Sequence, residues 1–187
     1  MSQPAGLPGG GGRLPRVLIA SELRPLLPQD PAPGCEVVWI GAEEPTPAGD
    51  FVAFLSLLRR RMGEEELAGL PGLRVLAQCA VGYDNIDLEA AARRGITVTH
   101  TPGVLTEATA DLTWALILAA ARRLKEGQEM IAQGTWTEWA PTQLLGMELG
   151  GATLGIVGAG RIGQAVGRRA LAFGMRILYT DPEPSPG

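Results

Sequence analysis

The sequence is poor in cysteine and histidine, the residues that form disulfides and hold many structural metal ions. Among 187 residues it has two cysteines, Cys35 and Cys79, and one histidine, His100. The cysteines are far apart and lack C-x-x-C spacing, which excludes a disulfide framework and a zinc site of that type. We predict no metal site, and we expect each thiol to be buried in a reducing, cytoplasmic protein.

The sequence also lacks an excess of basic charge and any long apolar run. It contains 16 Lys and Arg against 20 Asp and Glu, a net charge of −4. Nucleic acids and anionic membranes bind clustered basic faces, so neither is an expected partner. The apolar run WALILAAA is far shorter than the roughly 18 residues that span a bilayer. Residues 1–14, rich in Gly and Pro without an apolar centre, are predicted to form a disordered leader.

Short apolar and β-branched runs recur between turn signals, a pattern that indicates strands. Near-continuous runs of this length suit strands that are buried on both faces of a parallel sheet. The predicted strands are 16–20, 36–40, 51–56, 74–79, 96–100, 153–158 and 176–180. The predicted helices are 87–94, 107–124 and 161–173. This alternation predicts an α/β fold with right-handed crossovers.

The connections between these elements vary in length. Only GAEEPTPAGD, at 41–50, separates two strands, which predicts a loop without a full helix. The mostly apolar segment 107–124 is expected to be a helix buried between two layers or domains. We divide the chain into a domain at 15–101 and a second at 102–187.

The stretch LGIVGAGRIG follows a predicted strand and opens a predicted helix. Gly158 allows the tight turn, Gly160 allows a pyrophosphate to approach the backbone, and Gly163 allows the helix to pack closely on the sheet. The helix start, with Arg161 and Ile162, offers unpaired amides and a positive dipole end to phosphates. The pattern therefore predicts a dinucleotide site.

An acid ends the next predicted strand. Asp181 lies 21 residues beyond Gly160, where a carboxylate can accept hydrogen bonds from an adenosine ribose. A carboxylate repels a 2′-phosphate and no arginine follows it, so NAD(H) is favoured over NADP(H). The alternative is a glycine-rich turn of any α/β protein, with Asp181 a solvated loop acid, but the strand–turn–helix–strand–acid order favours the dinucleotide.

Three stretches carry a family resemblance. They are LAQCAVGYDNIDLEAAARRGITVTHTPGVLTEATADLTWALILAAARR, GTWTEW and LGGATLGIVGAGRIGQAVGRRALAFGMRILYTD. Together they resemble the D-isomer-specific 2-hydroxyacid dehydrogenases, closest to the glyoxylate/hydroxypyruvate reductase branch. The resemblance implies a flavodoxin-like parallel-sheet substrate domain followed by the first part of a Rossmann NAD-binding domain. It also implies NAD(P)H-dependent reduction of a small 2-oxo acid, glyoxylate or hydroxypyruvate, to the D-2-hydroxy acid.

The stretch CAVGYDNID follows a strand, so the amides of Val81 and Gly82 can turn outward into an anion-binding nest. The resemblance implies that these amides, with Ala80, hold the carboxylate of a 2-oxo acid. A simple strand-to-helix turn capped by Asp84 or Asp87 is the alternative, and both can hold at once.

A second stretch corresponds to a loop that edges the substrate pocket in the family. The residues concerned are Leu55 and Ser56, and the sequence after them departs from the family pattern. The arginine run 59–61 invites a role toward substrate charge, but solvated arginines beside the acids at 64–66 are the favoured explanation.

The resemblance also assigns cofactor and interface residues. Val104 and Thr109 match positions that line the nicotinamide, whereas Glu107 is equally compatible with a polar residue at a helix start. Trp136 and Trp139 match an arm that is exchanged across a homodimer, and clustered tryptophans are consistent with an interface. The alternative is that these tryptophans belong to the core.

No catalytic residue is assigned within this chain. The resemblance places the family's Arg, Glu and His beyond the equivalent of Asp181, and we interpret His100 as a structural or surface group. We therefore expect both domains to be incomplete, and the chain alone to oxidise no detectable NADH with glyoxylate or hydroxypyruvate. The alternatives are a 3-phosphoglycerate or D-lactate type dehydrogenase, a non-catalytic NAD-sensing binder, or a generic nucleotide-binding module.

Overall fold

The computed structural model describes residues 14–182, and the chain divides into two compact units between Pro102 and Gly103. The units are described separately below. The predicted leader, apart from Leu14, lies outside the described residues. No helix within residues 14–182 is both long and apolar enough to cross a membrane.

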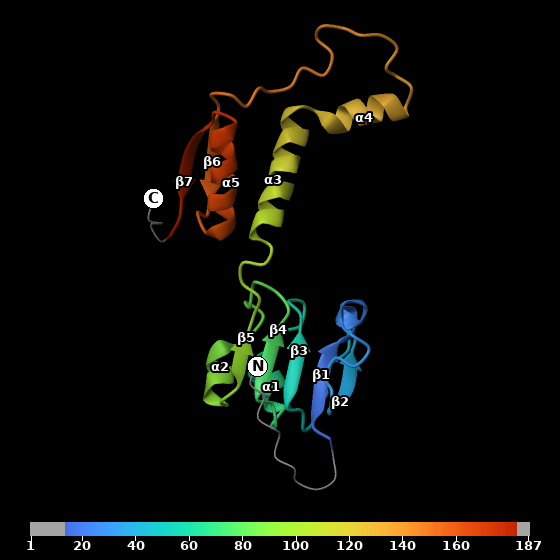
Figure 1. The fold of residues 1–187 in the computed structure, drawn as a ribbon, viewed down its shortest axis with the longest axis vertical. Helices are drawn as coiled ribbons and strands as arrows, with labels where there is room; N and C mark the ends of the chain where they lie inside the picture. Colours follow the sequence, from blue (N-terminus) through green and yellow to red (C-terminus); the bar gives the residue numbers. More distant parts are fainter. Residues whose placement is uncertain (1–13, 183–187) are drawn as a thin grey trace, which may run out of the picture. The chain divides into compact units, whose positions relative to one another are not determined.

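The first unit contains one parallel sheet (Figure 1). Its elements are β1 (Arg16–Ala20), η1 (Ser21–Leu26), β2 (Glu36–Ile40), β3 (Ala53–Ser56), α1 (Glu64–Ala68), β4 (Val75–Gln78), α2 (Leu88–Arg93) and β5 (Thr97–Thr99). The strand order is β2-β1-β3-β4-β5 and every pair is parallel. This is the flavodoxin-like order, so the predicted fold of the first domain is confirmed.

Alternate residues of the central strands supply two apolar clusters, one on each face of the sheet. Leu18, Phe54 and Leu76 are fully buried and pack with Leu67 of α1 and Ala90 of α2. The other face is covered less completely, by a small cluster around β1 that includes Leu23 of η1. Because β1 lies inside the sheet and contacts both clusters, its apolar run is continuous rather than alternating.

Some connections of the first unit agree with prediction and others were missed. Residues 41–50 contain no helix, as predicted. Asp87 caps α2, its carboxylate accepting a hydrogen bond of 2.8 Å from the N–H of Ala90. The prediction missed η1 because Pro25 interrupts helical periodicity, and it missed α1 because five residues are too few to establish a period.

The second unit contains α3 (Thr106–Ala121), α4 (Leu124–Ala132), β6 (Thr153–Val157), α5 (Arg161–Ala172) and β7 (Arg176–Thr180). Strands β6 and β7 pair in parallel, α5 connects and covers them, and α3 packs on α5 (Figure 1). The core joins Ala110 and Trp114 of α3 to Ala165, Val166 and Ala170 of α5. Trp114 donates a hydrogen bond of 3.0 Å from Nε1 to the carbonyl of Val166 and stacks on Phe173.

The predicted helix 107–124 is wrong in its end and in its burial. Helix α3 ends at Ala121, whose carbonyl accepts a hydrogen bond of 2.8 Å from the N–H of Met147. Arg123 then adopts a left-handed conformation, and a separate helix, α4, begins. Leu112 and Leu116 are more than half exposed, because only one side of α3 packs on α5.

Strands β6 and β7, unlike the central strands of the first unit, are covered on one face only. Ile156 and Ile177 pack toward α5, where a Cβ added to Gly167 would contact both side chains. The opposite face is bare: Val157 is 91% exposed and Leu178 is 67% exposed. Two strands and one crossover helix provide a cover for only one side of the sheet.

Candidate functional site

The predicted dinucleotide turn lies between β6 and α5. Gly158 has a φ of +90°, a conformation that side chains other than glycine rarely adopt, so it is suited to the sharp exit from the strand. A Cβ on Gly163 would fall well inside the van der Waals distance of the Gly158 carbonyl oxygen. Gly163 therefore lets the first turn of α5 lie against the end of β6.

Gly160 differs from its two neighbouring glycines. Its φ is −68°, and a Cβ added to it would meet no atom within 4 Å. Neither its backbone conformation nor its packing requires glycine. Open space at this point is what a ligand needs in order to approach the backbone closely.

The start of α5 carries positive charge. Gly160 is the N-cap residue and has no side chain to cap the first amides, which therefore point outward without intrahelical partners. Arg161, the first helical residue, is exposed and forms no ion pair within residues 14–182. A cation beside the positive end of a helix dipole is unfavourable unless an anion lies between them, so this helix start suits an anionic group.

The acid of the motif is tied directly to the turn. The Oδ2 atom of Asp181 accepts a hydrogen bond of 2.6 Å from the N–H of Ala159, and the N–H of Gly158 donates one of 2.8 Å to the carbonyl of Thr180. The turn and the end of β7 are thus brought together, with Ala159 buried between them. Ile162, also predicted to bind the cofactor, is half-buried in the first turn of α5 and packs on the core.

In the first unit, the ends of β3 and β4 bring the predicted substrate residues together. Ser56 pairs with Gln78 in the sheet, and the N–H of Cys79 donates to the Ser56 carbonyl at 2.9 Å. The loop of Ala80, Val81 and Gly82 follows directly and is half-buried. We call these three residues the carboxylate loop, after the role predicted for them.

The two residues predicted at the end of β3 are placed differently from each other. The Ser56 side chain is fully buried and its Oγ lies 3.5 Å from the carbonyl of Leu57, so it is directed into the protein. Leu55 is half-buried on the opposite face of the sheet. Closer to the carboxylate loop is Leu58, which a Cβ on Gly82 would contact at 3.4 Å.

A pair of amide side chains, Gln78 and Asn85, supports this region and was missed by the sequence analysis. Gln78 is 1% exposed, and its Nε2 donates to Asn85 Oδ1 at 2.8 Å. Asn85 in turn donates from Nδ2 to the carbonyl of Arg60 at 2.6 Å. The pair therefore connects the loop after β4 to the loop after β3. Single polar residues at strand ends carry no periodic signal, so pattern analysis does not detect them.

The end of β5 also holds the carboxylate loop. The N–H of Thr101 donates to the Ala80 carbonyl at 2.9 Å, and Nδ1 of His100 lies 2.8 Å from the Val81 carbonyl oxygen. The Tyr83 ring meets the imidazole edge to face, with centroids 5.1 Å apart. His100 therefore contacts the loop that is predicted to bind the substrate.

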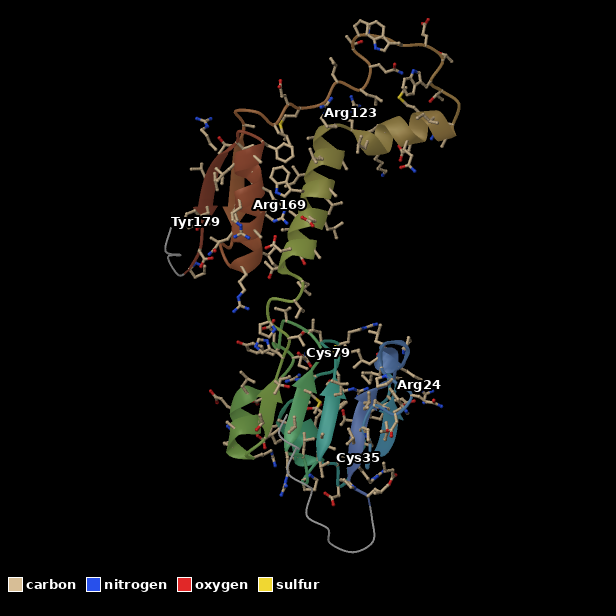
Figure 2. The ribbon with its side chains drawn as sticks, viewed as in Figure 1. Arg24, Cys35, Cys79, Arg123, Arg169 and Tyr179 are labelled. Atoms are coloured by element: carbon tan, nitrogen blue, oxygen red, sulfur yellow. The ribbon has the colours of Figure 1, made fainter. Side chains whose placement is uncertain are left out.

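The expectation that both thiols are buried is wrong for Cys79. Cys79 is exposed, whereas Cys35 is half-buried. Figure 2 labels both residues. Cys79 follows β4 immediately, where the chain leaves the sheet and its side chain is no longer covered by neighbouring strands. The described residues contain no group of three or more His, Cys, Asp or Glu side chains that could hold a metal ion.

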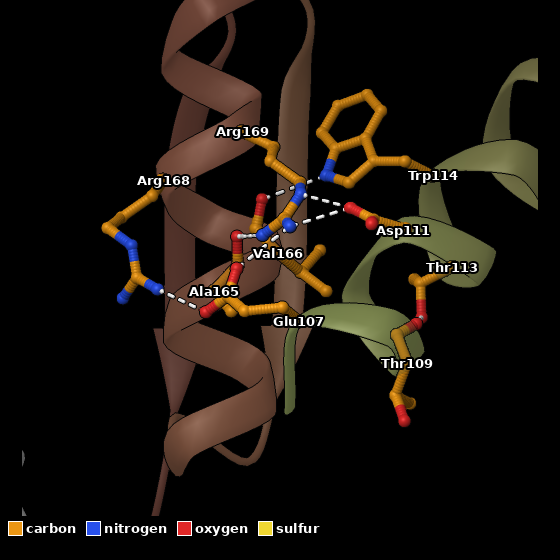
Figure 3. Close-up of polar contacts among 9 residues, drawn as sticks. All are labelled: Glu107, Thr109, Asp111, Thr113, Trp114, Ala165, Val166, Arg168 and Arg169. Carbon is orange, nitrogen blue, oxygen red and sulfur yellow. Dashed lines mark hydrogen bonds and ion pairs between the residues drawn. The ribbon is translucent and has the colours of Figure 1, made fainter. Parts of the chain in front are cut away.

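The polar residues near the start of α3 form ion pairs with α5. Figure 3 shows Arg169 between the carboxylates of Glu107 and Asp111, at 2.9 and 2.6 Å, while Arg168 pairs with Glu107 at 3.1 Å. The hydrogen bond that Arg169 donates to Glu107, followed by the one that it donates to Asp111, raises the pKa of Arg169 above its ordinary value. Glu107 is therefore part of the packing of α3 on α5.

The predicted nicotinamide residues lie on the same segment but are separate from this ion-pair group. Thr109 is half-buried, and its carbonyl accepts a hydrogen bond of 2.8 Å from the Thr113 hydroxyl (Figure 3). Val104 precedes α3 and is 74% exposed. Within residues 14–182, neither side chain takes part in the ion pairs of Arg169.

The two predicted interface tryptophans are not core residues. Trp136 and Trp139 lie in the irregular segment between α4 and β6, and Trp139 is 76% exposed. The alternative that they are buried is therefore wrong. An exposed indole places a large apolar surface in water, which is typical of residues that have a partner.

Comparison with known sequences decides the family. Residues 46–178 match the family described as D-isomer specific 2-hydroxyacid dehydrogenase, catalytic domain. The chain belongs to this family. A glyoxylate reductase of Korarchaeum cryptofilum is 55% identical over 133 residues, which make up 71% of this chain and 40% of that protein. A glyoxylate reductase of Aeropyrum pernix is 56% identical over 131 residues, 68% of this chain and 39% of that protein.

This member of the D-2-hydroxyacid dehydrogenase family thus falls in the glyoxylate reductase branch, and it spans about 40% of the length of these curated relatives. Solved structures of similar fold are also known. The TT0316 protein of Thermus thermophilus is 46% identical with a TM-score of 0.78, over 91% of this chain and 57% of that one.

Two further neighbours contain different cofactors. D-Lactate dehydrogenase of Aquifex aeolicus, complexed with NAD and lactic acid, is 28% identical with a TM-score of 0.76, over 90% of this chain and 52% of that one. An NADPH-dependent glyoxylate/hydroxypyruvate reductase of Sinorhizobium meliloti, in complex with NADP and malonate, is 33% identical with a TM-score of 0.78. The match covers 92% of this chain and 55% of that one. The family therefore includes both NAD and NADP complexes.

Proposed function

We propose that this chain forms the substrate-binding unit and the first half of the dinucleotide-binding unit of a reductase that converts glyoxylate or hydroxypyruvate to the D-2-hydroxy acid. The observation that carries the proposal is the open turn at Gly160, beside an uncapped helix start and Arg161. The high identity to glyoxylate reductases supports the choice of substrate class.

The residues of the turn fit a dinucleotide. The outward amides of α5 and the Arg161 guanidinium would hold the pyrophosphate, for which Gly160 leaves room. Asp181 would accept hydrogen bonds from the adenosine ribose, and Val104 and Thr109 would line the nicotinamide. When bound, the nicotinamide supplies the hydride that the 2-oxo carbon receives.

We infer a preference for NAD(H) over NADP(H). The Asp181 carboxylate lies at the end of β7, where a 2′-phosphate would meet a second negative charge. The residues that follow Asp181, PEPSPG, include no arginine. An arginine there would be needed to neutralise the 2′-phosphate.

In the first unit the proposed ligand is the substrate carboxylate. The amides of the carboxylate loop, Ala80 to Gly82, are proposed to donate hydrogen bonds to it, with Leu55 and Ser56 at the adjoining edge through their backbone. Binding the carboxylate in this way orients the 2-oxo group for reduction. The proton for the product hydroxyl is assigned to a histidine other than His100, because the family resemblance places the catalytic histidine beyond the equivalent of Asp181.

We also propose that the full enzyme is a homodimer in which Trp136 and Trp139 contact the partner subunit. The support is the exposure of both indoles in a segment without regular structure. Tryptophan is enriched among the residues that contribute most to protein interfaces.

The turn at Gly160 provides the test of the proposal. Gly160→Ala adds a methyl group that meets no protein atom, so the variant should retain the unfolding midpoint of the wild type. We expect it to bind NADH at least tenfold more weakly in a fluorescence titration, because the methyl group occupies the space assigned to the pyrophosphate. The matched control is Gly155→Ala on β6, whose Cβ also meets no atom. Equal NADH affinity in the two variants would contradict the proposed site.

A further inference from the structure

The carboxylate loop, Ala80 to Gly82, is held from behind by the last residues of the first unit. Thr101 donates from its backbone N–H to the Ala80 carbonyl at 2.9 Å. His100 Nδ1 lies 2.8 Å from the Val81 carbonyl oxygen. A carbonyl oxygen only accepts hydrogen bonds, so His100 carries a hydrogen on Nδ1 and donates it.

These two hydrogen bonds determine where the amides of the loop point. In a planar trans peptide, the C=O of one residue and the N–H of the next point in opposite directions. Because the Ala80 carbonyl faces Thr101, the Val81 N–H faces away from Thr101. Because the Val81 carbonyl faces His100, the Gly82 N–H faces away from His100. Both amides therefore point away from the segment of residues 100–101.

Two neighbours define the position of the imidazole and of the next peptide. Tyr83 contacts the His100 ring edge to face, at an interplanar angle of 88°, which restricts rotation of the ring. The Gly82 carbonyl lies 3.5 Å from Nε2 of the buried Gln78. The peptide after Val81 thus has its direction set by His100, while the peptide after Gly82 is near Gln78.

We propose that His100 is a positioning residue for substrate binding: its Nδ1–H holds the Val81–Gly82 peptide so that the Gly82 amide points at the substrate carboxylate. The inference rests on the proposed function, since it assigns the ligand of that amide. Thr101 acts through its backbone, which side-chain substitution leaves in place. His100 is therefore the member of the pair that mutation can test.

Three substitutions separate the hydrogen bond from the ring packing. His100→Asn carries Nδ2 on Cγ, as histidine carries Nδ1, so it keeps a donor near the Val81 carbonyl and loses the ring. His100→Phe keeps a ring against Tyr83 and loses the donor. His100→Ala loses both. The position is exposed, so all three variants are expected to fold.

The readout is a ¹H–¹⁵N NMR titration of the chain with oxamate, a non-reacting analogue of a 2-oxo acid, with acetate as the control anion. In the absence of ligand, the Gly82 amide resonance should move in the Phe and Ala variants and stay near its wild-type position in the Asn variant. Oxamate should bind the Phe and Ala variants about three- to tenfold more weakly than the wild type, the range expected for one lost hydrogen bond. The Asn variant should restore binding.

The possible outcomes distinguish failure of the His100 positioning role from failure of the proposed substrate site. If oxamate shifts the loop amides of the wild type but all three variants bind equally, the positioning role is wrong and the substrate site stands. If Phe binds like wild type and Asn like Ala, ring packing rather than the hydrogen bond matters, and the inference is again wrong. If oxamate leaves the Val81 and Gly82 amides of the wild type unmoved, the proposed substrate site itself fails, and the inference fails with it.

Discussion

The carboxylate of Asp181 lies 2.6 Å from the backbone nitrogen of Ala159 and accepts its hydrogen bond. One side chain at the end of β7 therefore contacts the turn that is proposed to hold the pyrophosphate. This contact gives Asp181 two functions to test, one in the turn itself and one in the choice of cofactor.

The first prediction separates these functions of Asp181. Asp181→Asn keeps an oxygen that can accept from Ala159 but removes the negative charge, so the ratio of NADPH to NADH affinity should rise about tenfold or more. Asp181→Ala should weaken NADH binding further, because it also loses the acceptor. Fluorescence titrations with both cofactors measure this. An unchanged cofactor ratio in the Asn variant would show that the charge at this position does not select the cofactor.

The second prediction concerns the packing of α5 on β6. Gly163→Ala places a methyl group against the carbonyl oxygen of Gly158, a backbone atom that cannot move aside on its own. We expect a loss of about 1–3 kcal/mol in the free energy of unfolding, as for other overpacked sites. Urea denaturation followed by circular dichroism measures it. Gly160→Ala, at a position with open space, is the matched control, and equal midpoints for the two variants would refute the packing argument.

The third prediction concerns pH and the ion pairs of α1. Hydrogen bonds from Arg93 and then Arg94 hold the pKa of Glu64 below its ordinary value of 4.5. A lowered carboxylate pKa in the folded state contributes stability that is present above the unfolded pKa and is lost as pH falls through the folded pKa. Glu64→Gln should therefore be slightly less stable than the wild type near pH 7, and the difference should disappear in acid.

The measurement for Glu64 is a set of urea midpoints between pH 3 and pH 7. Glu64, Arg93 and Arg94 are all exposed. The difference in stability between wild type and Glu64→Gln should therefore be small and should decrease with added salt. Glu65→Gln, on the same helix, is the control, because Glu65 forms no ion pair within residues 14–182. A difference between wild type and Glu64→Gln that persists unchanged at pH 3 would contradict the assignment.

The fourth prediction concerns the proposed dimer. Trp139→Ser should raise the dissociation constant of the dimer about tenfold or more, since interface tryptophans commonly contribute this much. Leu26→Ser, in the first unit, is the control with similar exposure, 78% against 76% for Trp139. Analytical ultracentrifugation across micromolar concentrations distinguishes them. A wild-type chain that stays monomeric throughout would remove the support for an interface at Trp139.

Much of the strand layout could be predicted, because each buried strand corresponds to a short apolar run in the sequence. The bounds of β1, β2 and β7 agree residue for residue with the apolar runs at 16–20, 36–40 and 176–180. The end of α3 could not be predicted in this way. It depends on a hydrogen bond between Ala121 and Met147, residues that are distant in the sequence.

The side chains around the proposed sites also fall into two groups: those whose role depends on local backbone geometry and those whose partners are distant in the sequence. Glycine and capping positions can be recognised because their backbone requirements are local: the left-handed φ of Gly158 and the cap at Asp87 are examples. The ion pairs of Arg169 with Glu107 and Asp111 join residues that are 62 and 58 positions apart in the sequence. No periodicity within either helix specifies that partnership.

The sequence by itself determined the α/β class, the order of the strands along the chain, the glycine-rich turn with the acid that follows the next strand, and the family. These follow from short-range rules: alternation of apolar residues, the backbone freedom of glycine, and motif spacing. Only the tertiary structure decided that His100 holds the Val81 carbonyl, that Gln78 and Asn85 join two loops, and that Cys79 and Trp139 are exposed. Each of these depends on which distant segments come together when the sheet forms, and a hydrogen bond between distant residues exists only once that packing has placed its donor and acceptor in range.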